Sequence, residues 1–263
     1  MTKNENLNST PKLADTDRTP DRKPVAVITG ASRGLGRELA GALADAGWHL
    51  VLTARSSTDL IEVAEQLAER TTVVALAGTV VDDDHRAELA HAAAVLGGAD
   101  LLINNASTLT GYDLGGEKMP SLARFPLPGL LETFEVNALA PIALTQLLLP
   151  QLRKNRGAII NLSSDAAVVA YPGWGGYGAS KAAFDHASAI LAQEEPDVLV
   201  WAVDPGDMRT AMHQEALPGE DISDLPLPET VVPAFLSLLE RQPASGRYLA
   251  SDLLAEMSLT EGA

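Results

Sequence analysis

The stretch Val25-Ala-Val-Ile-Thr-Gly-Ala-Ser-Arg-Gly-Leu-Gly36 decides the fold. Its first five residues are apolar or β-branched, which is typical of a buried strand. Its glycines permit a tight turn, and leucines at positions 35, 39 and 43 then follow at the spacing of one helix face. Gly47 ends that helix. The stretch therefore predicts a strand–turn–helix unit at the start of an α/β domain.

The same alternation continues outward from this unit. Buried strands are predicted at residues 49–53, 72–77, 100–104, 158–162, 198–203 and 248–249. Amphipathic helices are predicted between them, at about 60–67, 83–96, 130–144, 177–192 and 229–240. Strands that lack polar alternation are covered on both faces, which indicates a parallel sheet. With right-handed crossovers, the pattern predicts a single-domain, doubly wound α/β fold of the Rossmann-like kind.

Composition sets further bounds. Residues 1–23 are polar and are expected to form a flexible tail, which leaves residues 24–263 as the folded domain. The formal net charge of −16 argues against binding to nucleic acid or anionic membranes, because both need clustered Lys and Arg. The chain has no cysteine, no apolar run that could span a membrane and no signal peptide. We therefore expect a cytoplasmic protein without disulfides, and no residues have the spacing of a metal site.

The glycine-rich turn carries the first functional signal. Its spacing, Gly-x-x-x-Gly-x-Gly, is not that of a P-loop, because no Lys-Ser/Thr pair follows. Glycines at this place let the backbone N–H groups of a helix N-terminus approach a pyrophosphate. The alternative is an ordinary strand-to-helix turn without a ligand. The residues predicted to bind a dinucleotide here are Gly30, Ser32, Arg33, Gly34, Leu35 and Gly36.

The end of the second strand indicates which dinucleotide binds. An NAD site usually has an acid there for the ribose hydroxyls, but this chain has Thr53-Ala-Arg55-Ser56. Arg33 and Arg55 could both face a 2′-phosphate, whose oxygens suit the guanidinium fork. Their alternative role is that of solvated surface arginines. We predict NADP, with NADPH preferred over NADH, and we add Ser56 to its site.

Polar residues gather at the predicted carboxyl ends of later strands. Tyr177 and Lys181 are four residues apart, on one face of a helix. Ser163-Ser164 follows one strand, Asn104-Asn105-Ala106 ends another, and Pro205-Gly206 follows a third. Doubly wound folds bind their ligands at this edge of the sheet. These residues are therefore expected to meet at one site.

On these motifs, residues 24–250 resemble the short-chain dehydrogenase/reductase family. The glycine-rich turn, Asn-Asn-Ala, a helix Asn, Ser, Tyr-x-x-x-Lys and Pro-Gly-x-x-x-Thr occur in the order of that family. The family places its Ser thirteen residues before the Tyr, which selects Ser164 over Ser163. The resemblance implies the catalytic residues Asn137, Ser164, Tyr177 and Lys181. It also implies the cofactor-binding residues Asn105, Ala106, Ser107, Tyr177, Lys181, Pro205, Gly206, Met208 and Thr210.

The resemblance implies an NADP(H)-dependent oxidoreductase that interconverts a carbonyl and an alcohol. Tyr177 would exchange the proton with the substrate oxygen as general acid or base. Lys181 would lower the pKa of that phenol and bind the nicotinamide ribose. Ser164 would stabilise the developing negative charge, and Asn137 would hold a water that relays protons to Lys181.

The chain departs from the family pattern at three places. Ala77-Gly78 stands where the family often has an adenine-binding Asp at the end of the third strand, and Ser107 stands where Gly is usual. The loop 107–128 is long, which is typical of a functional or mobile segment. None of these departures removes the catalytic set.

Residues around the predicted site favour a small, moderately apolar carbonyl or alcohol substrate. The expected wall residues are Leu109, Tyr112, Tyr171, Trp174, Met208, Met212 and His213. One alternative is a reductase for ketoacyl groups on an acidic carrier protein. It is disfavoured because residues 185–263 hold 15 acids and only three bases, which repels such a partner. The alternative from another class is a non-catalytic NADP-binding regulator, which predicts a damaged Tyr/Lys/Ser set.

Self-association is also expected. The predicted helix 177–192 carries Ala182, Ala183, Phe184, Ala187 and Ile190, which is more apolar surface than one sheet face needs. The helix that contains Asn137 is similarly apolar. In the resembling family these two helices form the subunit interface, so we expect a homodimer or homotetramer.

Overall fold

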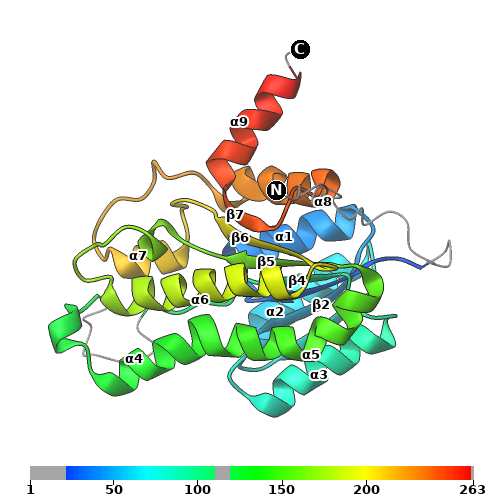
Figure 1. The fold of residues 1–263 in the computed structure, drawn as a ribbon, viewed down its shortest axis with the longest axis horizontal. Coiled ribbons are helices and arrows are strands. Elements are labelled where there is room, and N and C mark those ends of the chain that lie inside the picture. Colours follow the sequence, from blue (N-terminus) through cyan, green and yellow to red (C-terminus); the bar gives the residue numbers. More distant parts are fainter. Residues whose placement is uncertain (1–21, 110–118, 262–263) are drawn as a thin grey trace, which may run out of the picture.

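A computed structural model describes residues 22–109 and 119–261 (Figure 1). Its strands form one parallel sheet of seven strands in the order β3-β2-β1-β4-β5-β6-β7, which confirms the doubly wound α/β prediction. The strands are β1 (Val25–Thr29), β2 (His49–Ala54), β3 (Val73–Ala77), β4 (Leu101–Asn104), β5 (Ala158–Leu162), β6 (Leu199–Asp204) and β7 (Gly246–Leu249).

Helices cover both faces of this sheet. The α-helices are α1 (Gly34–Asp45), α2 (Ser57–Ala68), α3 (Asp83–Val95), α4 (Leu127–Phe134), α5 (Ala140–Asn155), α6 (Gly175–Glu194), α7 (Ala211–Ala216), α8 (Val232–Arg241) and α9 (Ala250–Glu261). Short helical turns are η1 (Leu122–Arg124), the π-helix η2 (Glu135–Leu139), η3 (Asp165–Ala167) and η4 (Pro228–Val231). Helices α1, α2 and α8 pack on one face, and α3, α5 and α6 pack on the other.

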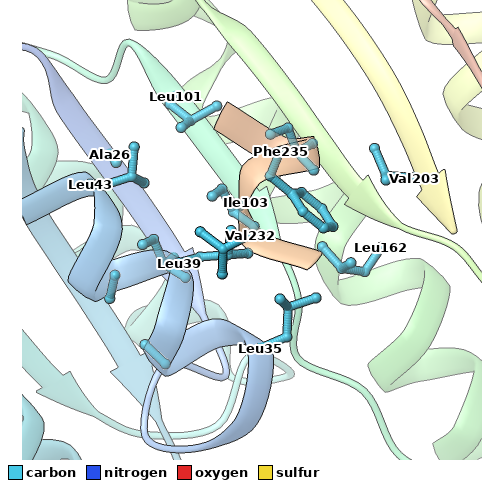
Figure 2. Packing of buried hydrophobic residues seen from close by; sticks show 14 of the residues in the cluster. Ala26, Leu35, Leu39, Leu43, Leu101, Ile103, Leu162, Val203, Val232 and Phe235 are labelled. Carbon is cyan, nitrogen blue, oxygen red and sulfur yellow. The ribbon is translucent and has the colours of Figure 1, made fainter. Parts of the chain in front are cut away.

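Two apolar clusters, one on each face, hold these layers together. In Figure 2, Leu35, Leu39 and Leu43 of α1 meet Val232 and Phe235 of α8 above the strands. The second cluster joins leucines of α3 and α5 to the opposite side chains of the strands. Successive strand residues point to opposite faces, so a parallel strand between two helix layers is apolar throughout.

The structure differs from the sequence predictions at three helices, one of which is α7, in a stretch where no helix was predicted. The helix predicted at 130–144 is divided into α4, the π-turn η2 and α5, with Asn137 in the π-turn. Periodicity does not reveal such a turn, since one additional residue shifts the helix face without interrupting the apolar pattern. Helix α9 was not predicted, because its buried apolar residues in the described chain, Ala250 and Leu253, are too few to mark a helix face.

The described chain is already anchored two residues before the predicted domain start. The Arg22 guanidinium donates to both oxygens of Asp100, at 2.8 and 3.1 Å, and to the carbonyl of Gly98. The buried Asp100 carboxylate also accepts the N–H of Val25, at 2.8 Å. The first strand is therefore fixed at its start. The flexible tail predicted for 1–23 otherwise lies outside the described residues.

Membrane-spanning helices and metal-binding clusters are both absent from the described residues. None of the helices within 22–109 and 119–261 is long and apolar enough to cross a membrane. The same residues contain no group of three or more His, Asp or Glu side chains placed to hold a metal ion.

Candidate active site

The carboxyl ends of β1, β4, β5 and β6 open into a cavity of about 1360 Å³. The predicted site residues that line it are Gly30, Ser32, Arg33, Gly34, Leu35, Arg55, Ser56, Asn105, Ala106, Ser107, Ser164, Tyr177, Lys181, Pro205, Gly206, Met208 and Thr210. Gly36 and Asn137 do not line the cavity and contact residues that do. The structure therefore brings segments from positions 30 to 210 to one place.

The glycine-rich turn is built by close backbone packing. Gly30 and Gly34 have φ angles of +68° and +53°, in the left-handed region that favours glycine. A Cβ atom on Gly36 would lie 2.3 Å from the carbonyl oxygen of Gly30 and 2.5 Å from the amide nitrogen of Asn105. That amide donates to the carbonyl oxygens of Thr29 and Gly30, at 2.9 and 3.0 Å. Asn105 thus holds the turn from the neighbouring strand.

Helix α1 presents an uncapped N-terminus to the cavity. Ser56 and Asp82 cap α2 and α3 with their side chains, whereas no side chain of the described residues caps α1 at Arg33. Its first residues, Gly34 and Leu35, line the cavity. The free N–H groups and the positive end of the helix dipole suit a phosphate. The turn therefore fits a dinucleotide pyrophosphate.

Tyr177 and Lys181 lie one turn apart on α6, where Lys181 is buried and Tyr177 is half-buried at the wall of the cavity. The Lys181 ammonium donates to the carbonyl oxygen of Leu162 at 2.7 Å and lies 5.6 Å from the centre of the Tyr177 ring. Burial lowers the pKa of Lys181 to about 8, although the carboxylates of Asp185 and Asp204 act in the opposite direction. The Lys181 ammonium can therefore release or take up a proton close to neutral pH.

The prediction that Lys181 lowers the pKa of Tyr177 is wrong for this structure. Burial raises the pKa of the Tyr177 phenol to about 12. The hydroxyl groups of Ser164 and Ser107 oppose this shift, and the charges of Asp204 and Asp165 add to it. Tyr177 is consequently held as a neutral proton donor.

Ser164 faces a carboxylate that the sequence analysis did not single out. Its hydroxyl donates to Asp165 at 3.1 Å, and the hydroxyl of Tyr171 donates to the second oxygen of Asp165 at 2.8 Å. Ser163, in contrast, donates to Asp185 at 2.6 Å. Both serines line the cavity, but the Tyr177 phenol has its hydrogen bond with Ser164, so Ser164 stays the predicted catalytic serine.

Asn137 has a different environment from the one expected. Its side-chain oxygen accepts from the Ser107 hydroxyl at 3.0 Å and from the Thr108 N–H at 2.8 Å. Its amide donates to the Thr108 carbonyl at 2.8 Å and to the Ser180 hydroxyl at 3.0 Å. These four bonds satisfy the amide group. Through them the Asn137 side chain fastens the loop after β4 to α6, and a relay water at this residue stays a prediction.

Comparison with known proteins identifies this arrangement. Residues 24–221 match the family model described as short chain dehydrogenase. The chain belongs to the short-chain dehydrogenase/reductase family. Its oxidoreductase relatives include the uncharacterized oxidoreductase YciK of Escherichia coli, which is 32% identical over 222 residues that cover 82% of this chain and 85% of the relative.

Two solved structures of short-chain dehydrogenases and related enzymes show the same fold. A short chain dehydrogenase from Escherichia coli CFT073, in complex with NADPH, superposes with a TM-score of 0.77 at 28% identity, covering 89% of this chain and 99% of that one. An alcohol dehydrogenase from the archaeon Thermococcus sibiricus, in complex with 5-hydroxy-NADP, gives 0.76 at 27% identity, covering 86% and 95%.

Two arginines of this short-chain dehydrogenase lie at the cavity, one beside the glycine-rich turn and one at the end of β2. Arg33 and Arg55 are exposed and line the cavity, and their guanidinium groups make no hydrogen bond or ion pair with any residue of the described segments. At the end of β3, a Cβ atom on Gly78 would lie 2.5 Å from the ring of His85, whose other nitrogen is 2.7 Å from the Thr53 hydroxyl. The histidine thus occupies the space behind Gly78, which explains the departure from the family pattern.

The substrate end is only partly as expected. The predicted wall residues that line the cavity are Leu109, Trp174, Met208, Met212 and His213. Tyr171 is not among the lining residues, because its hydroxyl is held by Asp165, and Tyr112 lies outside the described residues. The lining residues not predicted here are Pro128, Leu131, Glu132, Glu135, Val136, Asp165, Asp207 and Glu215. Five of them come from α4 and η2, and only the length of the preceding loop pointed to that segment.

Proposed function

We propose that this short-chain dehydrogenase is an NADP(H)-dependent oxidoreductase that interconverts a carbonyl and an alcohol on a small, moderately apolar substrate. One observation carries the proposal. A half-buried tyrosine, an ammonium beside it, a serine hydroxyl and two arginines whose guanidinium groups have no partner among the described residues all line the cavity that the glycine-rich turn enters. The NADPH and 5-hydroxy-NADP complexes of the similar structures support the cofactor assignment.

In the reductive direction, the Tyr177 hydroxyl donates its proton to the substrate carbonyl oxygen. Burial suits this task, because a phenol with a pKa of about 12 remains protonated at neutral pH. Ser164 turns its hydroxyl from Asp165 to the same oxygen and stabilises the charge that develops there. Lys181, with a pKa of about 8, then gives its own proton to the Tyr177 phenolate and takes up another from solvent in the cavity that it lines. NADPH supplies the hydride when it is bound.

Activity is tested with a panel of aldehydes, ketones and alcohols, each assayed with NADPH or NADP and with NADH or NAD. The proposal expects turnover of small carbonyl compounds with NADPH as the better cofactor. A non-catalytic regulator binds NADPH and turns over none of the panel. A reductase for carrier-bound ketoacyl groups turns over that substrate efficiently at physiological salt and the free compounds poorly. Each of these two results would replace the proposal.

Replacing Arg33 and Arg55 by alanine will raise the Kd for NADPH about 10- to 100-fold and change the Kd for NADH by less than about threefold. The reason is that each guanidinium contributes charge-assisted hydrogen bonds to the 2′-phosphate, which NADH lacks. Fluorescence titration of both cofactors measures the difference. Arg70→Ala, which removes an arginine paired with Asp45 outside this cavity, is the matched control. Equal weakening of both cofactors would show that the arginines do not bind the 2′-phosphate.

We also propose that the protein is a homodimer or homotetramer. Leu139 of η2, Leu147 of α5 and Ile190 of α6 are 59%, 43% and 46% exposed, on the two helical segments expected to form the interface. Phe184, which was counted toward the same surface, is instead buried within the protomer. The remaining exposed apolar residues are still suited to an interface.

The double substitution Leu147→Glu and Ile190→Glu will reduce the molar mass in solution to that of a single chain. Two charges in the centre of an apolar interface are costly to bury, whereas in the free protomer both side chains face solvent. Size-exclusion chromatography with light scattering measures the mass. Val95→Glu, at a 71% exposed valine on α3, should leave it unchanged. An unaltered oligomer in the double variant would place the interface elsewhere.

A further inference from the structure

Arg247 lies on the last strand, β7, and its side chain reaches across the sheet edge toward the active site. Residue 247 pairs with Ala202 of β6, and Figure 1 shows β7 beside β6 and close to the helix layer. Its guanidinium donates to Asp185 of α6, to Asp204 of β6 and to the carbonyl oxygen of Ser164, each at 3.0 Å. One side chain therefore joins β5, β6, β7 and α6.

Each of these three partners adjoins a residue of the proposed reaction. Ser164 is the serine whose hydroxyl would stabilise the substrate oxygen. Asp185 lies one helical turn after Lys181 and also accepts from Ser163, at 2.6 Å. Asp204 directly precedes Pro205-Gly206, and its other oxygen accepts the N–H of Gly206 at 3.0 Å. Arg247 thus contacts the backbone of the proposed catalytic serine, the aspartate one turn after Lys181, and the aspartate that precedes the Pro205-Gly206 loop.

The two carboxylates also dominate the electrostatics behind the site. The Asp185 and Asp204 side chains are 14% and 7% exposed, and one oxygen of Asp185 is buried without a hydrogen-bond partner in the described residues. Both charges raise the pKa of Lys181, and Asp204 together with Asp165 raises that of Tyr177. Arg247 contacts both Asp185 and Asp204 and so offsets their charge.

We propose that Arg247 is a positioning residue of the active site, which fixes the backbone of Ser164 and neutralises Asp185 and Asp204 behind Lys181 and Tyr177. This inference rests on the proposed function. Arg247 itself does not line the cavity, so it acts through these neighbours and contacts neither substrate nor cofactor. The guanidinium makes these three bonds from two nitrogens, Nε to Asp185 and Nη2 to Asp204 and Ser164, and the single nitrogen of a lysine does not reproduce that fixed fork.

The test compares Arg247→Met and Arg247→Lys with the wild type. In Arg247→Met the two carboxylates lose their cation, which favours the Lys181 ammonium and disfavours the Tyr177 phenolate. We expect kcat for carbonyl reduction to fall about tenfold, and the alkaline limb of its pH profile to move upward by about half to one pH unit. Arg247→Lys keeps the positive charge. It should return the alkaline limb of the pH profile to its wild-type position and recover only part of kcat. Asp185→Asn, added to Arg247→Met, should shift the limb back down.

Arg241→Met is the matched control. It removes an arginine that pairs with Glu256 at 2.7 Å on the surface formed by α8 and α9, and it should leave kcat and the pH profile unchanged. A purely structural role for Arg247 would lower the midpoint of thermal unfolding in Arg247→Met and leave the pH profile of the folded fraction as in the wild type. That result would overturn the inference.

A second measurement does not depend on turnover. In protein labelled with ¹³C-lysine, the Cε signal of Lys181, assigned by its loss in Lys181→Arg, titrates with the ammonium. The inference predicts that Arg247→Met moves this midpoint to higher pH from its wild-type position near 8. If the midpoint moves while no carbonyl compound is turned over, the proposed function fails and the electrostatic role of Arg247 stands. An unmoved midpoint contradicts the inference, whatever the activity.

Discussion

Replacing Tyr177 by phenylalanine will lower carbonyl-dependent oxidation of NADPH by about a thousandfold or more. The substitution removes the hydroxyl that would give its proton to the substrate oxygen, and a positioned general acid contributes on the order of 10² to 10⁴ in rate. NADPH affinity should stay within about threefold, since the ring that fills this part of the cavity remains. Initial rates and fluorescence titration of NADPH measure the two effects separately.

Tyr248→Phe is the matched control for this experiment. The Tyr248 hydroxyl donates to the Ala244 carbonyl at 2.7 Å, and the residue does not line the cavity, so its loss should leave the rate within about twofold. If Tyr177→Phe keeps the wild-type rate, Tyr177 is not the proton donor. If it binds NADPH less tightly in proportion to the lost rate, the phenol serves binding and not proton transfer.

Replacing Gly36 by alanine will destabilise the fold by about 2–3 kcal/mol and weaken NADPH binding at least about tenfold. The added Cβ would lie 2.3 Å from the Gly30 carbonyl oxygen and 2.5 Å from the Asn105 amide, and neither group is free to move, because that amide holds the turn. The turn must therefore open at the place where helix α1 presents its N–H groups. Urea unfolding and cofactor titration measure the two losses.

Gly41→Ala provides the contrast within the same helix. A Cβ atom at Gly41 meets nothing within 4 Å, so alanine should stabilise α1 by about 0.5–1 kcal/mol through its helix propensity and leave NADPH binding unchanged. If Gly36→Ala is as stable as Gly41→Ala, the close packing of the turn does not limit its sequence. Equal NADPH affinity in Gly36→Ala and Gly41→Ala would show that the close packing of the turn does not affect cofactor binding.

Much of the fold and of the candidate site could be predicted because the signals are local. The alternation of apolar strands and amphipathic helices is visible in short windows, and it places the ends of parallel strands at one edge. The glycine-rich turn, Tyr177 and Lys181 are short motifs within single elements. For this reason their convergence on one cavity could be expected before any coordinate was known.

The remaining features depend on contacts between distant segments, which no local pattern records. Arg247 reaches Ser164 over 83 residues of sequence, and its surroundings contain nothing that distinguishes it from the other arginines. Nothing in the sequence distinguishes Asp165 from other acidic residues, and only the structure shows that the hydroxyls of Ser164 and Tyr171 donate to it. The raised pKa of Tyr177 likewise follows from burial, which depends on how the whole protein packs. Charge and burial at the site therefore had to come from the structure.

The hold of Asn105 on the glycine-rich turn has a consequence for the growing polypeptide. The turn and the amide that fastens it are 75 residues apart, and β1 pairs with β4 as well as with β2. A nascent chain that has emerged only as far as α3 contains every glycine of the turn, yet lacks one of its two flanking strands. Such long-range closure comes late in folding. The proposed dinucleotide site therefore forms only when the central sheet is complete. An isolated peptide of residues 25–47 would not form it.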